Sequence, residues 1–296
     1  MYFTGFADDA AKGIDGQIKA TLDLGWHNIE ARAIDGVNIH DLDDATFDAV
    51  AEKLSRAGVQ INCFGSAIAN WAKSIEKEED FEKDLEQTHR AIIRMKRLGT
   101  PLIRIMSDAV LKDRAPEDQL REKRIERLRR IVDLFLDAGI QPVHENCMNY
   151  GGMGWPFTLR LLENVPGLKL VYDTGNPVFT DDKAKPKPYP KQSSWEFYSH
   201  VRDFIAYVHI KDGVFDHATG KTTYTWPGEG DGDVVRIVED LIARGYDGGF
   251  SMEPHMALVF HDANVTAQAQ AMHDNYVEYG RRFMAIVEAA KAKANR

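Results

Sequence analysis

The chain has 296 residues, of which 44% are hydrophobic and 28% are charged, as in an ordinary globular protein with a large core. Its net charge of −9 argues against a nucleic-acid partner, because phosphate binding needs a basic surface. No apolar run approaches the roughly 18 residues that span a bilayer, so we expect no membrane partner.

The cysteines and the first residues bear on the cellular compartment. Cys63 and Cys147 are the only cysteines, and two cysteines cannot form a disulfide framework. The segment from Tyr2 to Phe6 has neither the basic nor the apolar region of a signal peptide. We therefore expect a cytoplasmic protein.

Short apolar segments alternate with longer amphipathic ones along the chain. The predicted strands cover residues 2–6, 27–31, 59–64, 101–106, 140–145, 168–173, 205–210 and 248–253. The predicted helices include 15–24, 44–56, 81–98 and 117–138, and a C-terminal helix at about 265–292. Several amphipathic segments end in a glycine, which fits the left-handed position that closes a helix: Gly25, Gly58, Gly99, Gly139 and Gly245.

Eight β/α repeats most simply close into a parallel barrel with the helices outside. The sequence thus predicts an α/β fold, a (β/α)8 TIM barrel that forms a single domain over residues 1–296. A doubly wound open sheet is the alternative, but its GxGxxG fingerprint is missing after the first strand. The proline-rich segment 183–191 is predicted to be an irregular loop, which serves as a lid, a partner contact or a mobile surface segment.

Four predicted strands end in a side chain that can bind a hard metal ion, namely Glu145, Asp173, His209 and Glu253. Any one of these residues alone is better explained as a helix cap or half of a salt bridge. Three acids in one barrel mouth, however, need a positive partner, because burial and repulsion penalise their charges. The set predicts one divalent ion, with Mn²⁺, Mg²⁺, Co²⁺ and Zn²⁺ all compatible.

Other residues near these strand ends are candidates for substrate binding. Lys211 and His255 share the alternation of His209 and Glu253, so both are expected to face the pocket. The alternative for Lys211 is a surface salt bridge with Asp212.

Three further candidates are less closely tied to the metal ligands. Asn176 follows Asp173, and Trp155 ends a glycine-rich loop, where it either stacks on a sugar ring or packs internally. Glu30 ends the second strand and either binds a substrate hydroxyl or pairs with Arg32. His144 points away from Glu145 and is expected to be structural.

The strand-end motifs resemble those of the xylose-isomerase-like barrel superfamily of sugar isomerases, epimerases and dehydratases. The matching segments are 144–146, 171–176, 208–212, 228–231 and 252–253. The resemblance implies that one divalent metal, most often Mn²⁺, is bound by the four ligands, and that Glu145 and Glu253 serve as acid and base. It also implies a dimer or tetramer.

The chain departs from the ketose 3-epimerases of this superfamily at three places. Gly151 stands where those enzymes usually carry a substrate-binding Glu, and Asn176 stands where they have His. Residues 215–217 replace a region that commonly contains Arg.

The predicted chemistry is proton transfer at a carbon next to a carbonyl, through a metal-stabilised enediolate. The first hypothesis is a metal-dependent sugar isomerase or epimerase. The second is a dehydratase or β-eliminating lyase that acts on a keto sugar or inositol-like compound. The third is a carbohydrate-binding subunit without turnover.

Overall fold

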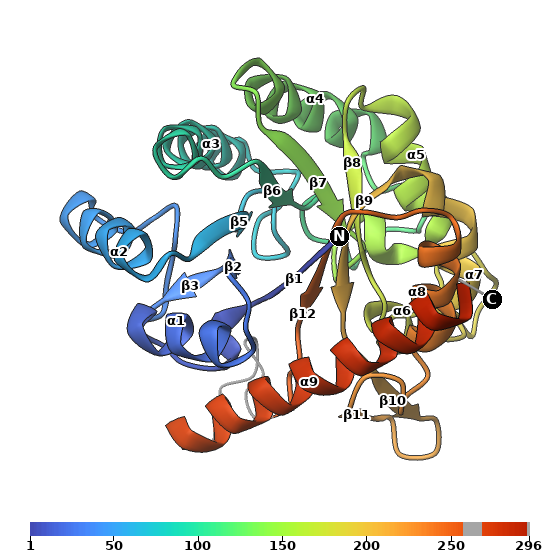
Figure 1. Ribbon diagram of the computed structural model, residues 1–296. Coiled ribbons are helices and arrows are strands. Elements are labelled where there is room, and N and C mark those ends of the chain that lie inside the picture. Colours follow the sequence, from blue (N-terminus) through green and yellow to red (C-terminus); the bar gives the residue numbers. More distant parts are fainter. Residues whose placement is uncertain (257–267, 295–296) are drawn as a thin grey trace.

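Eight parallel strands form a nearly closed barrel in the computed structural model, which describes residues 1–256 and 268–294 (Figure 1). The strands are β1 (Tyr2–Gly5), β2 (Asn28–Ala31), β5 (Gln60–Gly65), β6 (Leu102–Ile105), β7 (Gln141–Glu145), β8 (Lys169–Asp173), β9 (Ile205–Ile210) and β12 (Gly249–Met252). Their order is β1-β12-β9-β8-β7-β6-β5-β2. A parallel bridge between Phe6 and Glu30 joins the two edges. The predicted single-domain barrel is confirmed.

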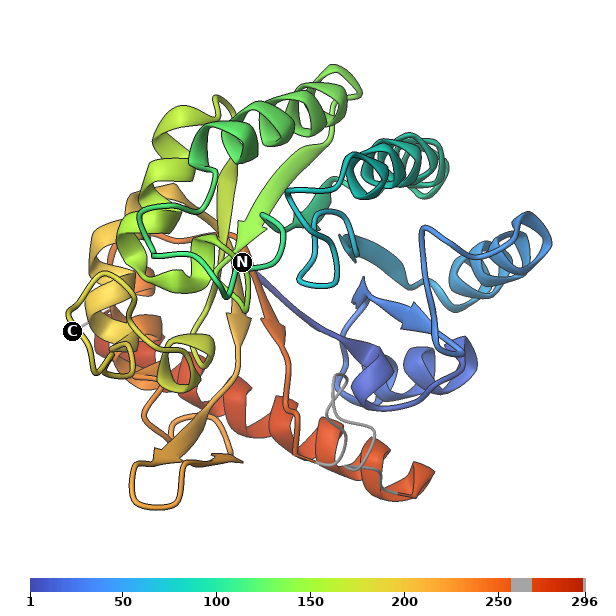
Figure 2. The same cartoon turned by 180° about the vertical axis from the view of Figure 1, so that it is seen from behind.

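Helices surround this barrel on its outside (Figures 1 and 2). They are α1 (Ile14–Asp23), α2 (Asp44–Ala57), α3 (Glu78–Leu98), α4 (Arg121–Asp137), α5 (Trp155–Asn164), α6 (Asn176–Phe179), α7 (Ser194–Val201), α8 (Val234–Ala243) and α9 (Ala269–Ala294). Short 3₁₀ turns lie at Ala7–Asp9, Gly151–Met153 and Arg202–Phe204. Two hairpins leave the barrel, β3 (Ala33–Ile34) with β4 (Val37–Asn38), and β10 (Gly213–Asp216) with β11 (Lys221–Tyr224).

Helix α2 shows how the sequence sets these elements. Asp43 accepts a hydrogen bond from the Thr46 backbone N–H and so begins the helix. Phe47, Val50 and Leu54 recur at helical spacing and are buried against the barrel. Gly58 ends the helix with a φ of 66°, which an L side chain adopts only at a steric cost. The other four predicted closing glycines also have positive φ.

The C-terminal helix α9 runs along one side of the molecule, where it packs against α8 and α1 (Figure 1). It begins at Ala269, and the start predicted near residue 265 lies outside the described residues. Among the described helices, none combines the length and apolarity that a membrane crossing requires.

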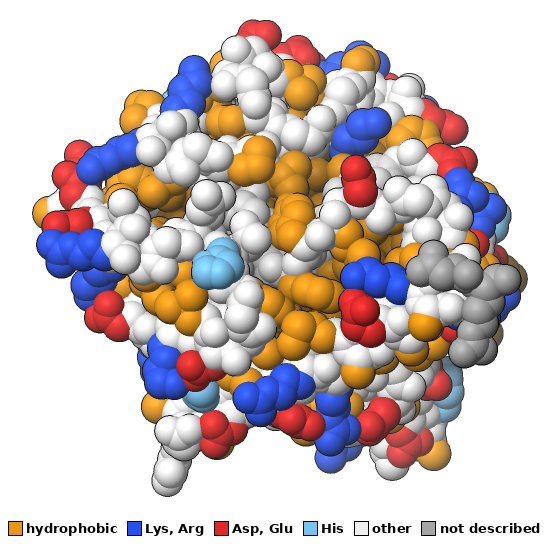
Figure 3. All heavy atoms as spheres, in the orientation of Figure 1, with side chains coloured by type: hydrophobic (Ala, Val, Ile, Leu, Met, Phe, Trp, Pro, Cys, Tyr) orange, Lys and Arg blue, Asp and Glu red, His pale blue; other side chains and the backbone are white. Residues whose placement is uncertain are grey.

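The surface carries both signs of charge. On the face shown in Figure 3, Lys and Arg side chains are interspersed with Asp and Glu around the rim. Hydrophobic side chains gather toward the middle of that face. This face therefore lacks the continuous basic field that nucleic-acid binding requires.

Candidate metal centre

The four predicted ligands meet at the carboxyl-terminal ends of neighbouring strands. One donor atom each from Glu145, Asp173, His209 and Glu253 lies within 4.8 Å of all the others, and all four residues are buried. The parallel register explains the convergence, because it pairs Asp173 on β8 with His209 on β9. The Glu253 backbone N–H bonds to the Ile210 carbonyl at 3.0 Å, which holds Glu253 beside β9.

The donor atoms of this cluster fit a divalent cation. His209 Nδ1 is buried without a hydrogen-bond partner and lies 4.0 Å from Asp173 Oδ2, which is buried and pairs with Lys211 Nζ at 3.0 Å. Glu145 Oε1 lies 3.5 Å from His209 Nδ1. The other oxygen of Asp173 is already used, since it accepts backbone N–H bonds from Gly175 and Asn176 at 2.9 and 2.7 Å. Three carboxylate oxygens and one imidazole nitrogen therefore face a common centre.

Glu30 fixes the orientation of His209. Its two oxygens lie 3.1 and 3.0 Å from His209 Nε2, and Oε2 also accepts a bond from Ser251 Oγ at 2.6 Å. A carboxylate on Nε2 leaves the lone pair of Nδ1 free for a metal. Glu30 is fully buried beneath His209, so the predicted contacts of Glu30 with a substrate hydroxyl or with Arg32 are corrected to this role.

Two buried arginines hold the outer oxygens of the two catalytic candidates. Arg104 Nη1 bonds to Glu145 Oε2 at 3.0 Å, and Arg32 Nη1 bonds to Glu253 Oε1 at 2.7 Å. Both guanidinium groups lie over the ring of Phe6, at 5.3 and 4.4 Å from its centroid. Each glutamate thus keeps only its second oxygen for the centre.

One residue pattern in the sequence indicates this arrangement. Arg104 stands within the otherwise apolar strand Leu102-Ile103-Arg104-Ile105, and a cation buried there needs a carboxylate partner. Arg32 has no comparable signal, because it lies just beyond β2. It bonds to Asp8 and Asp9 at 2.8 and 2.7 Å as well as to Glu253.

Lys211 faces the cluster as predicted. Its Nζ lies 3.0 Å from Asp173 Oδ2 and 2.6 Å from Glu253 Oε2. The alternative pairing with Asp212 is excluded by geometry. Asp212 accepts backbone N–H bonds from the glycine-rich turn at 2.8–3.1 Å, donated by Gly213, Gly228, Gly230 and Gly232.

The buried charges leave an excess of negative charge around the cluster. The buried carboxylates are Asp8, Asp9, Glu30, Glu145, Asp173 and Glu253. The buried cations that touch them are Arg32, Arg104 and Lys211. A divalent ion would offset most of the difference, since buried carboxylates need compensating charge.

The pKa values of the ligands reflect this imbalance. Burial lowers the pKa of His209, but Glu30 and Glu145 outweigh it and raise that pKa to about 10. Burial, with the charges of Glu253 and Glu145, raises the pKa of Asp173 to about 6 against the effect of Lys211. Both shifts favour the protonated forms, the direction expected when carboxylates crowd together.

The two catalytic candidates have the opposite shift. Burial would raise the pKa of Glu145, but Arg104 and His209 outweigh it and hold that pKa at about 2. Burial acts in the same way on Glu253, and Lys211, His255 and Arg32 hold its pKa well below the usual range. Both glutamates are therefore carboxylates at neutral pH, which can accept a proton.

A cavity of about 1070 Å³ lies beside the cluster, and two predicted substrate residues that contact the ligands line it. Asn176 donates from Nδ2 to Glu145 Oε1 at 3.2 Å. His255 Nε2 lies 3.1 Å from Glu253 Oε1, and its backbone has a φ of 53°. Tyr224, on β11, packs its ring 5.2 Å from that of His255. Asn176, at the start of α6, and His255, after β12, thus connect the ligands with the cavity.

Trp155 does not reach this cavity. It begins α5, and its ring stacks on that of His200 of α7 with centroids 3.8 Å apart. The glycine-rich loop before it turns through a short 3₁₀ segment, which directs the indole toward the outer helices. The predicted sugar contact of Trp155 is therefore corrected to helix packing, the other alternative for this residue.

His144 is structural, and it explains Gly151. The His144 ring is fully buried, and its Nε2 lies 3.0 Å from Ser107 Oγ. A Cβ added at Gly151 would collide with the His144 ring. The glycine is thus required by packing, and the substrate-binding Glu of ketose 3-epimerases cannot be accommodated here.

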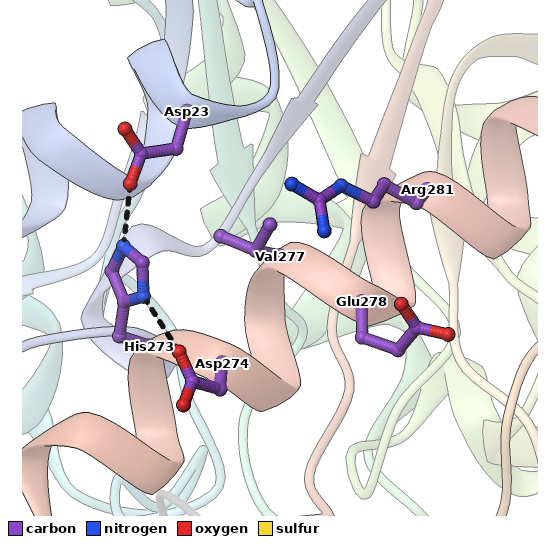
Figure 4. Close-up of a pocket in the computed structure, with 6 residues that line it drawn as sticks. All are labelled: Asp23, His273, Asp274, Val277, Glu278 and Arg281. Atoms are coloured by element: carbon purple, nitrogen blue, oxygen red, sulfur yellow. Dashed lines mark hydrogen bonds and ion pairs between the residues drawn. The ribbon is translucent and has the colours of Figure 1, made fainter.

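A second concavity lies on the outer helices. It measures about 450 Å³ and is lined by charged residues of α1 and α9 (Figure 4). His273 lies in it between Asp23 Oδ2 at 2.9 Å and Asp274 Oδ1 at 3.3 Å. These groups pair with one another on the helix surface, whereas the four predicted metal ligands are buried at the barrel mouth.

Comparison with known proteins extends these observations. Residues 18–276 match the family model described as Xylose isomerase-like TIM barrel. Three solved structures illustrate the similarity in fold. A xylose isomerase-like TIM barrel protein from Mycobacterium smegmatis, in complex with magnesium, is 19% identical, with 97% of each chain covered and a TM-score of 0.68. An L-ribulose 3-epimerase is 17% identical, with 99% of this chain and 96% of that chain covered and a TM-score of 0.66.

The third structure is the probable 3-DHS dehydratase AsbF from Bacillus anthracis. It is 19% identical, with 93% of this chain and 98% of that chain covered and a TM-score of 0.63. None of the curated proteins searched matches this sequence. Because the family model covers most of the chain, the protein belongs to the xylose isomerase-like TIM barrel family.

Proposed function

We propose that this protein is a divalent-metal-dependent isomerase or epimerase of a sugar or sugar-like compound. The observation that carries the proposal is the pair Glu145 and Glu253. Both are carboxylates of one buried cluster, and an arginine holds the outer oxygen of each. The inner oxygens face the centre, where Lys211 contacts that of Glu253 at 2.6 Å and Asn176 contacts that of Glu145 at 3.2 Å. Such a pair suits proton removal and return at a carbon next to a carbonyl.

The side chains at this site have distinct roles in the proposed reaction. One glutamate removes the proton, and the other returns it, either to the opposite face or to the neighbouring carbon. Lys211 and Asn176 lie beside these carboxylates and would hold substrate oxygens in place. A divalent ion bound by Glu145, Asp173, His209 and Glu253 would supply Lewis-acid stabilisation of the developing enediolate charge.

Mn²⁺ is the proposed metal, with Mg²⁺, Co²⁺ and Zn²⁺ as alternatives. Three oxygen donors and one nitrogen donor suit these ions. The related Mycobacterium smegmatis structure is described with magnesium, and a related structure named IOLI is described with zinc. Metal content measured on protein purified without added metal would decide among the four ions.

Hydrogen exchange tests the proposed reaction. The Mn²⁺-loaded protein should incorporate solvent deuterium at a sugar carbon, and chelation or Glu253→Gln should abolish the incorporation. Glu229→Gln is the matched control, because Glu229 is an exposed partner of Arg282 at 3.0 Å. Absence of exchange across a broad panel of aldo and keto sugars would refute the proposal. Tight sugar binding without exchange would instead favour a carbohydrate-binding subunit.

A dehydratase or β-eliminating lyase is the second candidate. Two residues of the cavity favour it, because His255 lies next to Glu253, Tyr224 packs on His255, and either could protonate a departing hydroxyl. Burial raises the pKa of Tyr224, so its phenol stays protonated at neutral pH. The family also includes a protein named as a dehydratase. A new enone-type ultraviolet absorbance during turnover would identify this activity.

We also propose a cytoplasmic location and a homodimer or homotetramer. Cys63 and Cys147 are both buried free thiols, which suits a reducing compartment. The expected partner is a small sugar-like molecule, and neither nucleic acid nor membrane is expected. Light scattering of the purified protein would measure the oligomeric state.

A further inference from the structure

The cavity at the metal cluster is larger than one sugar ring requires. It measures about 1070 Å³ and extends from Asn176 and His255 to loops that the proposed chemistry does not use. Pockets that enclose a drug-sized ligand typically measure roughly 300–1,000 Å³. A single monosaccharide over the ligands would leave much of this volume to water.

The part of the cavity away from the ligands is mainly apolar. Trp71 follows β5, Val110 follows β6, Met148 follows β7 and Phe179 ends α6, and all four side chains line the cavity. Met148 is 48% exposed although it is hydrophobic, and Trp71 is partly exposed. Exposed apolar side chains from separate loops that gather in one hollow mark a binding surface.

Aromatic rings form a continuous path from the ligands to this wall. His255 lies 3.1 Å from Glu253, and the Tyr224 ring packs edge-on against His255 with centroids 5.2 Å apart. Phe179 packs edge-on against Tyr224, again at 5.2 Å. A flat apolar group attached to a ligand at the metal cluster would meet ring surfaces along its length.

Two of the three lysines at the cavity rim are paired within the protein and do not favour an anionic ligand. Lys183 and Lys191 both lie at the rim, and both bond to Asp181, at 3.0 and 2.9 Å. Their ammonium groups are therefore engaged within the protein. Lys112 is the third rim lysine and is exposed to solvent. The wall formed by Trp71, Val110, Met148 and Phe179 is apolar, so a neutral group is favoured over a phosphate there.

On the basis of the proposed function, we infer that the substrate is a sugar that carries a planar apolar or aromatic substituent, such as an aryl glycoside with a carbonyl group at another carbon of the sugar. The sugar ring lies at Glu145 and Glu253, and the substituent lies against Trp71, Met148 and Tyr224. This substrate class fills the cavity that a free monosaccharide leaves empty.

Matched glycoside pairs test this inference by binding alone. Phenyl and methyl glycosides of glucose, galactose, mannose and xylose are titrated into the Mn²⁺-loaded protein by calorimetry. In at least one pair the phenyl compound should bind about tenfold more tightly, because ring stacking and apolar burial are gained together. Trp71→Ala should remove this preference while the affinity for the methyl partner stays within about twofold.

Two further variants distinguish a loss of phenyl binding from a loss of folding. Met148→Asp places a charge on the apolar wall at a half-exposed position, and it should also remove the phenyl preference. Trp155→Ala is the matched control, because its indole stacks on His200 outside the cavity, and the preference should persist. Circular dichroism melting verifies that each variant is folded.

Equal affinities within all four pairs would overturn the inference, as would a phenyl preference that survives both cavity variants. A larger gain from a 4-carboxyphenyl or phosphorylated glycoside than from the neutral phenyl compound would also overturn it, in favour of an anionic substrate. Deuterium exchange with free sugars but no phenyl preference refutes this inference and leaves the proposed function intact. A phenyl preference without any exchange refutes the proposed reaction alone.

Discussion

Replacing Glu30 with glutamine should weaken metal binding without removing a metal ligand. Glu30 is fully buried, and its carboxylate accepts bonds from His209 Nε2 at 3.0 Å and from Ser251 Oγ at 2.6 Å. The variant Glu30→Gln keeps the shape but removes the charge that orients the imidazole and strengthens Nδ1 as a donor. Losing such a carboxylate partner typically costs about 10–100-fold in metal affinity, which is about 1.4–2.7 kcal/mol.

Calorimetric titration with Mn²⁺ measures this effect. The wild-type protein, Glu30→Gln and the control Glu229→Gln are first freed of metal with a chelator and then titrated at one pH and one salt concentration. Glu229 is an exposed glutamate that bonds to Arg282, so its loss should leave Mn²⁺ affinity unchanged. Thermal melting of the three metal-free proteins separates weaker binding from unfolding.

The reasoning fails if Glu30→Gln binds Mn²⁺ as tightly as the wild-type protein while it remains folded. That result would mean that Nδ1 of His209 is not a ligand, or that its orientation does not depend on Glu30. A loss equal to that of His209→Ala would show that Glu30 is indispensable for the ligand and not only a support.

Three further perturbations test the packing around the centre. Arg104→Met should lower the free energy of unfolding by about 3–5 kcal/mol in urea titrations, because it leaves the buried carboxylate of Glu145 without its cation; a change below about 1 kcal/mol would contradict this pairing. Gly151→Ala should lower the free energy of unfolding by about 1–3 kcal/mol, because its Cβ clashes with the His144 ring, and this loss should shrink in a His144→Ala background. Equal losses in both backgrounds would exclude this contact. Burial lowers the pKa of His144 to about 4, so the unfolded chain binds a proton at higher pH than the folded protein does. The free energy of unfolding should therefore fall by on the order of 3 kcal/mol as the pH drops from 6.5 toward 4. A His144→Gln variant with the same pH profile would refute the assignment to His144.

The sequence predicted the barrel because its signals are local and repeated. Each closing glycine and each short apolar run depends only on neighbouring residues, and the five predicted glycines take the left-handed conformation. The four ligands could be predicted for a related reason. In a parallel barrel all strand ends lie at one mouth, so one ligand-type residue at each end implies convergence.

The supporting residues could not be predicted in the same way. Arg32 contacts Asp8, Asp9 and Glu253, which are separated from it by up to 221 positions, and only the closed barrel brings them together. Glu30 was expected at the barrel mouth, but its contact with His209 depends on the side chain pointing inward below the ligands.

Trp155 shows why the contacts of loop residues are hard to predict from the sequence. An aromatic residue after a glycine-rich segment fits a binding loop and a helix start equally well. The 3₁₀ turn at Gly151–Met153 directs it to the outer helices, and the first residue of this turn packs against the distant His144 ring. Trp71, which lines the cavity, carries no motif that distinguishes it from other loop aromatics.

Anomalous diffraction from a Mn²⁺-soaked crystal tests the central claim most directly. The account predicts one strong peak at the barrel mouth, roughly 2.0–2.4 Å from an oxygen of Glu145, Asp173 and Glu253 and from Nδ1 of His209. A peak that touches only two of these residues would contradict it. So would a peak confined to the outer concavity around His273 and Asp23, with Lys211 still bonded between Asp173 and Glu253.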